Sequence, residues 1–246
     1  MPSAAQPGSR CVRAWVTDLR TGLVVVALLA GCASQIAAPP EARTAGAANP
    51  QDAYYRRLAA EGRPVYGVDP GRSLVVIEVR RGGTLAHLGH DHVVASHDVG
   101  GYVAPDEGRA DFHVPLDALV VDEPALRAES GFTTQPAPED IAGTRNNMLQ
   151  KVLETDRYRF ALVTVDNRMA GRGMQPLPVA ITLHGVTRSI DVLAQVDRSG
   201  EEISVAGSAA IDQSWFGITP FSVLGGAIAV QDRLNITFRI RARRID

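Results

Sequence analysis

The sequence lacks the short motifs that mark the common enzyme classes. It has no GxSxG nucleophile elbow, no CxxC pair, no Walker phosphate loop, no HExxH helix and no Rossmann glycine pattern. Cysteine is scarce too, because only Cys11 and Cys32 occur among 246 residues. These absences leave no familiar catalytic motif, and we predict that the chain is not an enzyme.

The amino-terminal segment has the features of a bacterial lipoprotein signal. Three arginines, the last at Arg20, precede the apolar run 22–30, which is too short to span a bilayer as a mature helix. The run leads into the sequence LAGC at residues 29–32, the form of a lipobox, whose cysteine thiol carries diacylglycerol. We therefore predict that residues 1–31 are removed and that Cys32 is lipidated. A plain cleaved signal peptide and an uncleaved anchor are the simpler alternatives.

Processing at this point has consequences for location and charge. Lipidated Cys32 would anchor the protein stably, with three acyl chains, on the periplasmic side of the cell envelope, and Ala33 favours sorting to the outer membrane. The mature chain keeps no second cysteine and so forms no internal disulfide. It retains 22 basic and 26 acidic residues, because residues 1–31 contain three arginines and one aspartate. This negative balance predicts no affinity for nucleic acid or for anionic membrane surfaces.

A short linker is expected between the lipid and the folded part. Residues 33–50 are rich in alanine, proline and glycine and contain almost no large apolar side chain, so they cannot bury enough surface to fold. Residues 51–62 could form a short helix, which would either pack on the domain or belong to the linker. We place the tether at residues 32–64 and one domain, long enough for its own core, at 65–246.

From residue 65 onward the apolar pattern is that of β-strands. Apolar residues occupy every second position of 234–242, and they alternate in Val179–Gln195 on both sides of a turn at His184 and Gly185. The second pattern is typical of an antiparallel hairpin with one buried face. About eight such strands predict an all-β fold, either a sandwich or a barrel.

One segment breaks the strand pattern. Residues 138–140, Pro-Glu-Asp, suit the first turn of a helix, and the following apolar residues fall on one helical stripe. The stripe consists of Ile141, Met148, Leu149, Val152 and Leu153. A single amphipathic helix beside a closed sheet would cap an open end or cover a flank, and either place suits a barrel with an unfilled interior.

A histidine-rich segment is the one cluster that could carry chemistry. In an extended chain His90 and His92 project to the same face, with Cα atoms about 7 Å apart. Two imidazoles at this spacing could share a zinc or copper ion, with a third ligand from another histidine. The alternative is a polar patch at the rim of the barrel that orients a turn or a ligand head group. His184, within a hairpin turn, is expected to be structural.

Five sets of segments, in a fixed order, can be compared with a known family: Tyr66–Pro70 with Ser73–Val79, Arg145–Leu149 with Arg157–Phe160, Ile181–Val186, Phe216–Ile218 and Val230–Leu234. Their sequences and their order resemble the YceI-like family of periplasmic lipid-binding barrels, over about residues 65–246. Three positions depart from the family pattern: Arg159 replaces a usual proline, Met148 replaces a common histidine, and the LGHDH stretch replaces a G-x-F region. The chain therefore resembles a divergent subgroup.

The resemblance implies an antiparallel, lipocalin-like barrel that holds a long polyisoprenoid or acyl chain. An eight-stranded barrel is just wide enough to be filled by its own side chains or to hold one slim ligand. Aliphatic walls suit a hydrocarbon, because each buried CH₂ stabilises the complex by about 0.8 kcal/mol. The candidate lipid-binding residues are Val76, Phe112, Phe160, Leu162, Ile181, Leu183, Ile236 and Phe238, with His90 and His92 at a polar mouth.

Two other functions stay open at this stage. The chain could be an envelope metalloprotein that uses His90 and His92, or a scaffold or stress protein whose barrel is fully packed. Under the favoured hypothesis its partners are a long-chain lipid and, through Cys32, the membrane, and it needs no cofactor. The sequence leaves homodimer formation open.

Overall fold

The computed structural model describes residues 51–166 and 172–245. The predicted signal peptide, Cys32 and the tether up to residue 50 lie outside these residues. In chain order the helices and strands are α1 Asp52–Ala60, β1 Val65–Val68, β2 Leu74–Gly82, β3 His92–Ser96, β4 Gly100–Ala104, β5 Arg109–Pro115, β6 Val120–Val121, α2 Pro124–Glu129, α3 Pro138–Asn147, β7 Phe160–Asp166, β8 Gly173–Leu183, β9 Val186–Ser199, β10 Glu202–Asp212, β11 Ser222–Val223 and β12 Ile228–Ile245. None of the helices in the described ranges has the length and apolar character needed to cross a membrane.

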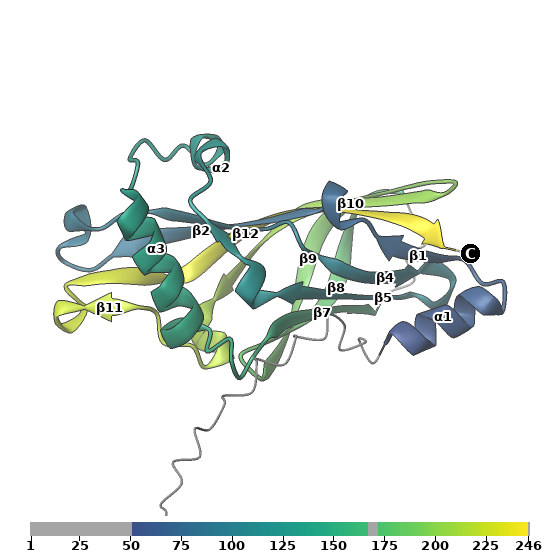
Figure 1. Cartoon of the computed structure of the whole chain (residues 1–246). Helices are drawn as coiled ribbons and strands as arrows, with labels where there is room; N and C mark the ends of the chain where they lie inside the picture. The colour runs from purple at the N-terminus through teal and green to yellow at the C-terminus, as the bar shows by residue number, and fades with distance from the viewer. Residues whose placement is uncertain (1–50, 167–171, 246) are drawn as a thin grey trace, which may run out of the picture. The chain divides into compact units, whose positions relative to one another are not determined.

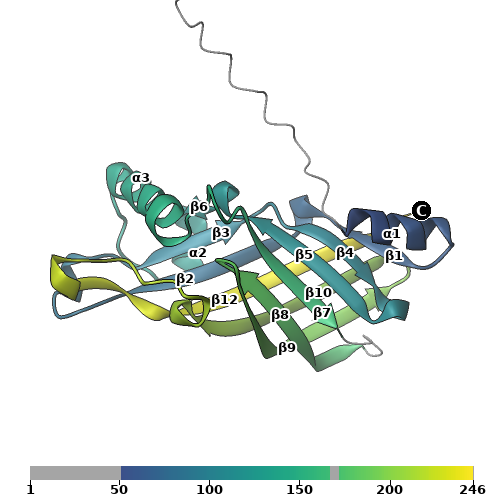
Figure 2. The same ribbon diagram turned by 90° about the horizontal axis from the view of Figure 1, so that it is seen from below.

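Eight strands form a closed antiparallel barrel. Their order around the ring is β1-β4-β5-β7-β8-β9-β10-β12, and the pairing of β12 with β1 closes it. Figures 1 and 2 show these strands wrapped around one axis, with β2 and β3 extending beyond the ring. Of the two all-β architectures that the alternation allowed, the barrel is confirmed.

The long strand β12 makes the two ends of the barrel different. One edge of β12 pairs with β10. Along the other edge, the β12 residues 229–239 pair with β2, and the β12 residues 242–245 pair with β1. Strands β3 and β6 continue outward from β2. We call β2, β3 and β6 the wing. Since the wing leaves the ring, the barrel splays at that end.

The opposite end is solid. Tyr66, Val103 and Ala110 are fully buried there, in one cluster with residues of β7 to β10. The Tyr66 hydroxyl donates a hydrogen bond to the carbonyl of Gly200 at 3.0 Å and so ties this plug to the β9–β10 turn. This packed layer closes the lumen at the end of the barrel opposite the wing.

Helix α1 packs against this solid end and corrects the predicted domain boundary. Tyr55 and Leu58 are buried against Val65 and Ala104, and the Tyr55 ring stacks on Tyr102 with centroids 5.0 Å apart. Residues 51–62 thus take the helical, packed alternative and are not part of a free tether. Tyr55 and Leu58 lie one turn apart on the same face of α1, so the helix buries an apolar face against the barrel.

The β8–β9 hairpin has the geometry expected from its sequence. Leu183 pairs with Val186 across a two-residue turn, in which His184 and Gly185 have φ of 52° and 76°. Positive φ at both positions is what a type I′ turn requires. The His184 ring packs on Tyr158 with centroids 4.3 Å apart, and its Nε2 lies 3.4 Å from the carboxylate of Glu154.

Helix α3 begins at Pro138, as predicted, and continues through a π-helical turn at Met148–Val152. Figure 1 shows it at the splayed end of the barrel, away from α1. The Arg145 guanidinium holds it to the segment beside β6 by donating hydrogen bonds to the carbonyls of Leu119 and Asp117, at 3.2 and 2.6 Å. The helix therefore caps an open end, one of the two places expected for it.

Candidate functional site

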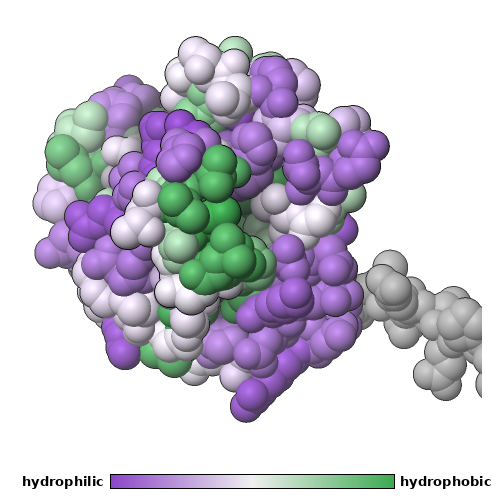
Figure 3. All heavy atoms as spheres, turned by 90° about the vertical axis from the view of Figure 1, so that its left-hand side faces the viewer, coloured by the Kyte–Doolittle hydropathy of each residue, from purple (hydrophilic) through white to green (hydrophobic). Residues whose placement is uncertain are grey.

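The splayed end of the barrel contains a cavity of about 600 Å³. This volume lies within the range typical of small-molecule sites, which are concave and mostly apolar. Figure 3 looks onto this end and shows hydrophobic residues gathered in a recess that hydrophilic residues surround. The lumen is therefore not filled by the protein's own side chains.

Small residues on β10 leave this space open. Gly207 and Ala209 face the lumen, and the Phe238 ring of the neighbouring strand fills the position where a Gly207 side chain would lie. A Cβ built on Gly207 would come within 2.9 Å of Phe238 Cζ. The same Cβ would come within 2.8 Å of the carbonyl oxygen of Leu193 on β9, so the close approach of the backbone and of the Phe238 ring requires glycine at this position.

The lumen wall is overwhelmingly aliphatic. Its side chains come from the inward rows of the ring, from the inner face of the wing and from α3. Among the predicted residues, the wall contains Phe112, Ile181, Leu183, Ile236, Phe238, His90 and His92. The structure therefore brings seven of the ten candidates together around one cavity, while their contact with a lipid stays a prediction.

The other three candidates lie on the outer face. Val76 packs beneath α2 with Val93 and Leu126, so the apolar run of β2 has two buried faces and the lumen receives Val75, Ile77 and Val79 instead. Phe160 and Leu162 are 39% and 44% exposed. The lumen side of β7 carries the smaller Ala161, Val163 and Val165.

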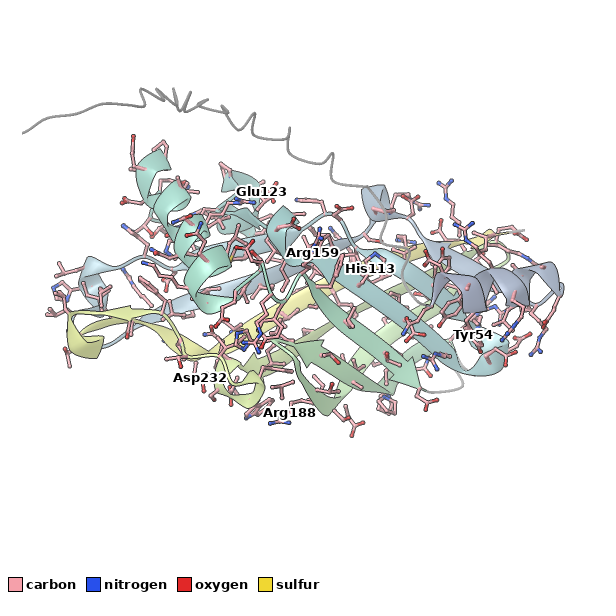
Figure 4. All side chains as sticks on the ribbon, turned by 60° about the horizontal axis from the view of Figure 1, so that its bottom comes forward. Tyr54, His113, Glu123, Arg159, Arg188 and Asp232 are labelled. Carbon is pink, nitrogen blue, oxygen red and sulfur yellow. The ribbon has the colours of Figure 1, made fainter. Side chains whose placement is uncertain are left out.

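The outward placement of the β7 residues follows from their register. Leu162 pairs with His113, whereas Val163 pairs with the inward Phe112. The His113 ring meets Phe160 edge-on, with centroids 5.7 Å apart. Figure 4 labels His113, on β5, and Arg159, the residue that precedes β7. The sequence analysis named Phe160 and Leu162 as candidates for the lumen, and the structure places both on the outer face.

Helix α3 supplies wall residues that the sequence analysis did not include. Glu139, Asp140, Thr144 and Asn147 border the cavity together with Met148. The amphipathic pattern indicated a cap but not which turn would face the lumen. Polar side chains are thus concentrated at the mouth, above the aliphatic interior.

Exposed apolar residues continue the lumen outward. Leu88, Val223 and Leu224 are 59%, 40% and 71% exposed. Leu88 precedes the wall residue Gly89 in the chain, and Val223 and Leu224 follow shortly after the wall residue Phe221. Leu88 lies in the connection between β2 and β3, and Leu224 lies in the connection between β11 and β12. A hydrogen bond from Leu85 N–H to the carbonyl of Ala227, at 2.7 Å, joins the two connections. We call Leu88, Val223 and Leu224 the apolar lip.

His92 is oriented by a buried ion pair. Its Nδ1 lies 2.6 Å from Asp122 Oδ2, while Asp122 Oδ1 accepts hydrogen bonds from Arg127 Nη1 at 2.5 Å and from Val93 N–H at 3.0 Å. Both Asp122 and Arg127 have fully enclosed side chains. Burial alone would raise the pKa of the Asp122 carboxyl, but the hydrogen bonds from His92, Val93 and Arg127 outweigh it and hold the pKa below its ordinary value.

His90 lies beside His92, with ring centroids 6.3 Å apart. Its Nδ1 is buried and has no hydrogen-bond partner in the described part of the chain. No group of three metal-binding side chains occurs within residues 51–166 and 172–245. His97 pairs with Glu123, and His113 and His184 have the contacts given above, so none of them joins the pair.

Three solved structures are similar to this chain, and the first of them supports the barrel. A polyisoprenoid binding domain from Saccharophagus degradans superposes with a TM-score of 0.54 at 16% identity, covering 73% of this chain and 98% of that one. Burkholderia cenocepacia BcnA gives 0.48 at 13% identity, covering 71% and 98%. A Campylobacter jejuni YceI protein gives 0.41 at 14% identity, covering 62% and 85%.

The search of curated proteins gave no match. The match to a protein family, by contrast, covers most of the chain, from residue 66 to residue 242, and so extends from β1 through the barrel to β12. The segments on which the sequence analysis based the resemblance all fall within this range. The chain belongs to the family of YceI-like domains.

Proposed function

We propose that this protein binds one long-chain lipid, of polyisoprenoid or fatty-acyl type, in the open end of its barrel, and carries or sequesters it without chemical change. The observation that supports the proposal most directly is the cavity of about 600 Å³ with aliphatic walls. A flexible hydrocarbon gains free energy in proportion to the apolar area that it buries there. The polyisoprenoid binding domain with the same fold is consistent with this ligand class.

The apolar lip gives the lipid a route into the cavity. Exposed apolar residues that border a pocket mark a place where an apolar surface, such as a membrane, is met. A hydrocarbon that leaves a bilayer would meet Leu88 and Leu224 first and then the wall residues Gly89 and Phe221. This arrangement suits a carrier that exchanges its ligand with a membrane.

Filling the lumen tests the binding function. Ala209 faces the cavity and Ala210, the next residue of β10, is exposed. Ala209→Phe should reduce the affinity for a fluorescent alkyl probe at least tenfold while the protein stays folded, and Ala210→Phe should leave it unchanged. Equal affinities of the two variants would contradict binding in the lumen, and circular dichroism would verify the fold of each.

We also propose that the protein is held in the cell envelope through lipidated Cys32. The lipobox sequence at residues 29–32 supports this, and it is consistent with a carrier that works at a membrane. Metabolic labelling with radioactive palmitate should label the wild-type protein and not Cys32→Ala. An unlabelled wild-type protein would contradict the lipid anchor without affecting the cavity.

A further inference from the structure

Hydrogen bonds to other parts of the chain fix the segment His90-Asp91-His92 in place. Asp91 Oδ1 accepts a hydrogen bond from the backbone N–H of Arg81 at 2.9 Å, and the Asp91 carbonyl accepts one from Arg127 Nη1 at 2.7 Å. Both flanking histidines line the lumen. The ties to Asp91 therefore set the positions of two imidazole rings at the mouth of an apolar cavity.

The ion pair beneath His92 determines which of its nitrogens carries the hydrogen. Asp122 is an ionised carboxylate with no hydrogen to give, so His92 Nδ1 must be the donor in the 2.6 Å hydrogen bond. In the neutral ring the other nitrogen, Nε2, then has a free lone pair. His92 thus offers the lumen a hydrogen-bond acceptor.

His90 has the opposite character. Its Nδ1 is enclosed by the wall and finds no donor or acceptor among the described residues. An unsatisfied acceptor is tolerated in protein interiors somewhat more readily than an unsatisfied N–H, so the hydrogen belongs on Nε2. Because Nδ1 is enclosed, the edge of the ring that remains for the lumen carries Nε2. His90 thus offers a hydrogen-bond donor.

The charges around this pair disfavour an anionic ligand. The ionisable residues that line the cavity, besides the two histidines, are Arg81, Glu139 and Asp140. Arg81 already donates to the carbonyl of Gly89 at 2.9 Å and lies 3.7 Å from the Asp91 carboxylate. The charge of Arg127 is matched by Asp122. A carboxylate or phosphate at the mouth would therefore meet two acidic side chains of α3 without a free cation to balance it.

We propose that His90 and His92 form a head-group site for a lipid with a terminal hydroxyl, such as a long-chain or isoprenoid alcohol. A hydroxyl oxygen can accept a hydrogen bond from His90 Nε2 and donate one to His92 Nε2, so it satisfies both rings at once. Ring centroids 6.3 Å apart leave room for a single oxygen between them. The inference rests on the proposed lipid binding and specifies the ligand class.

Four ligands with the same tail test the head-group site: dodecane, dodecanol, dodecanoate and dodecylamine, each competing with a fluorescent alkyl probe near pH 8. The wild-type protein should bind dodecanol on the order of tenfold more tightly than dodecane, as two hydrogen bonds between uncharged groups allow. His90→Phe replaces the imidazole with an apolar aromatic ring and should bring the ratio of dodecanol affinity to dodecane affinity close to one. His97→Phe, on the outer surface, should retain the full preference.

The possible outcomes separate the two proposals. Equal affinities of wild-type protein for dodecane and dodecanol, or tighter binding of dodecanoate or dodecylamine than of dodecanol, would overturn the hydroxyl site and leave the lipid cavity standing. Failure of all four ligands to displace the probe would instead contradict the proposed function. Because the first comparison uses only the wild-type protein, a folding defect in a variant cannot obscure it.

Discussion

Arg127 is the residue on which the geometry of the mouth depends most. Its guanidinium is fully enclosed and donates hydrogen bonds to the carbonyls of Asp91 and Thr134 as well as to Asp122. An enclosed ion pair contributes little net stability, because desolvation of the two charges offsets their attraction, but removal of one partner leaves an uncompensated charge. The pair is therefore best understood as a device that holds residues 90–92 in place.

Replacement of Arg127 tests this reading. Arg127→Met should lower the free energy of unfolding by about 3–5 kcal/mol, because the Asp122 carboxylate remains buried without its cation. Arg57→Met is the matched control, since Arg57 and its partner Glu61 are exposed and such pairs contribute about 0.5 kcal/mol or less. Urea unfolding of the two variants measures both values. A loss for Arg127→Met as small as that of the control would show that the pair relaxes freely.

A second buried carboxylate makes stability depend on pH. Burial alone would raise the pKa of Asp111, but hydrogen bonds from Arg109, Tyr55 and Thr164 outweigh it and lower the pKa below its ordinary value of 3.8. The unfolded chain therefore takes up the proton first as the pH falls. The contribution of Asp111 to stability is complete above pH 3.8 and is lost as the pH falls below it through the lower folded-state pKa.

This sign gives a measurable slope. The free energy of unfolding of the wild-type protein should fall steadily between about pH 4 and pH 2, and the fall should be shallower in Asp111→Asn, which has no proton to take up at this site. Urea titrations at a series of pH values give both curves. Parallel curves would mean that Asp111 does not take part in the acid transition.

At the scale of elements, α3 stands at the mouth of the cavity. Its inner side borders the lumen, and Arg145 fastens it to two carbonyls beside β6. Besides these hydrogen bonds, Ile141 and Met148 pack against the apolar cluster around Leu116 and Leu119. Elements held by few contacts open at low free-energy cost, so these are the contacts that displacement of α3 would have to break. Release of a bound lipid should therefore be limited by the contacts of α3.

Loosening α3 should accelerate release. Arg145→Ala removes both hydrogen bonds and should raise the dissociation rate of a bound fluorescent alkyl probe several-fold, because each neutral acceptor contributes about 1 kcal/mol or more to holding the closed position. Arg56→Ala, on the exposed face of α1, is the control. Stopped-flow displacement measures the rates. If the two variants release the probe equally fast, α3 does not gate the cavity.

The strands show which parts of the site are readable from sequence. In β12 the outward positions are polar, so alternation alone identified Ile236 and Phe238 as inward. In β2 and β7 both faces carry apolar residues, and alternation cannot tell them apart. The outer side of β2 is covered by α2, a tertiary contact with no local signature, which is why Val76 was misplaced. The position of Asp122 at His92 was unreadable for the same reason, because 30 residues separate them.

On the scale of the whole molecule, one barrel combines a solid half with a hollow half. The plug of Tyr66, Val103 and Ala110 closes one end of the barrel and stabilises it, while the wing leaves the opposite end open. This division has a consequence for ligand choice. A lumen with a fixed floor accepts a tail only up to a definite length, whereas an open tunnel would accept any length.

The length limit can be measured with a series of straight-chain alcohols. Each added CH₂ that enters the lumen should strengthen binding by about 0.8 kcal/mol, so that two carbons increase the affinity roughly tenfold. Once the tail reaches the plug, further carbons must emerge at the mouth over the apolar lip, where they stay partly in contact with water and contribute less. A plot of the strength of binding against chain length should therefore rise steeply and then level off.

Isothermal titration calorimetry gives the slope of this plot together with the negative heat-capacity change expected for apolar burial. A flat plot would mean that the tail does not enter the lumen, and a line without a bend would mean that the plug yields to the ligand.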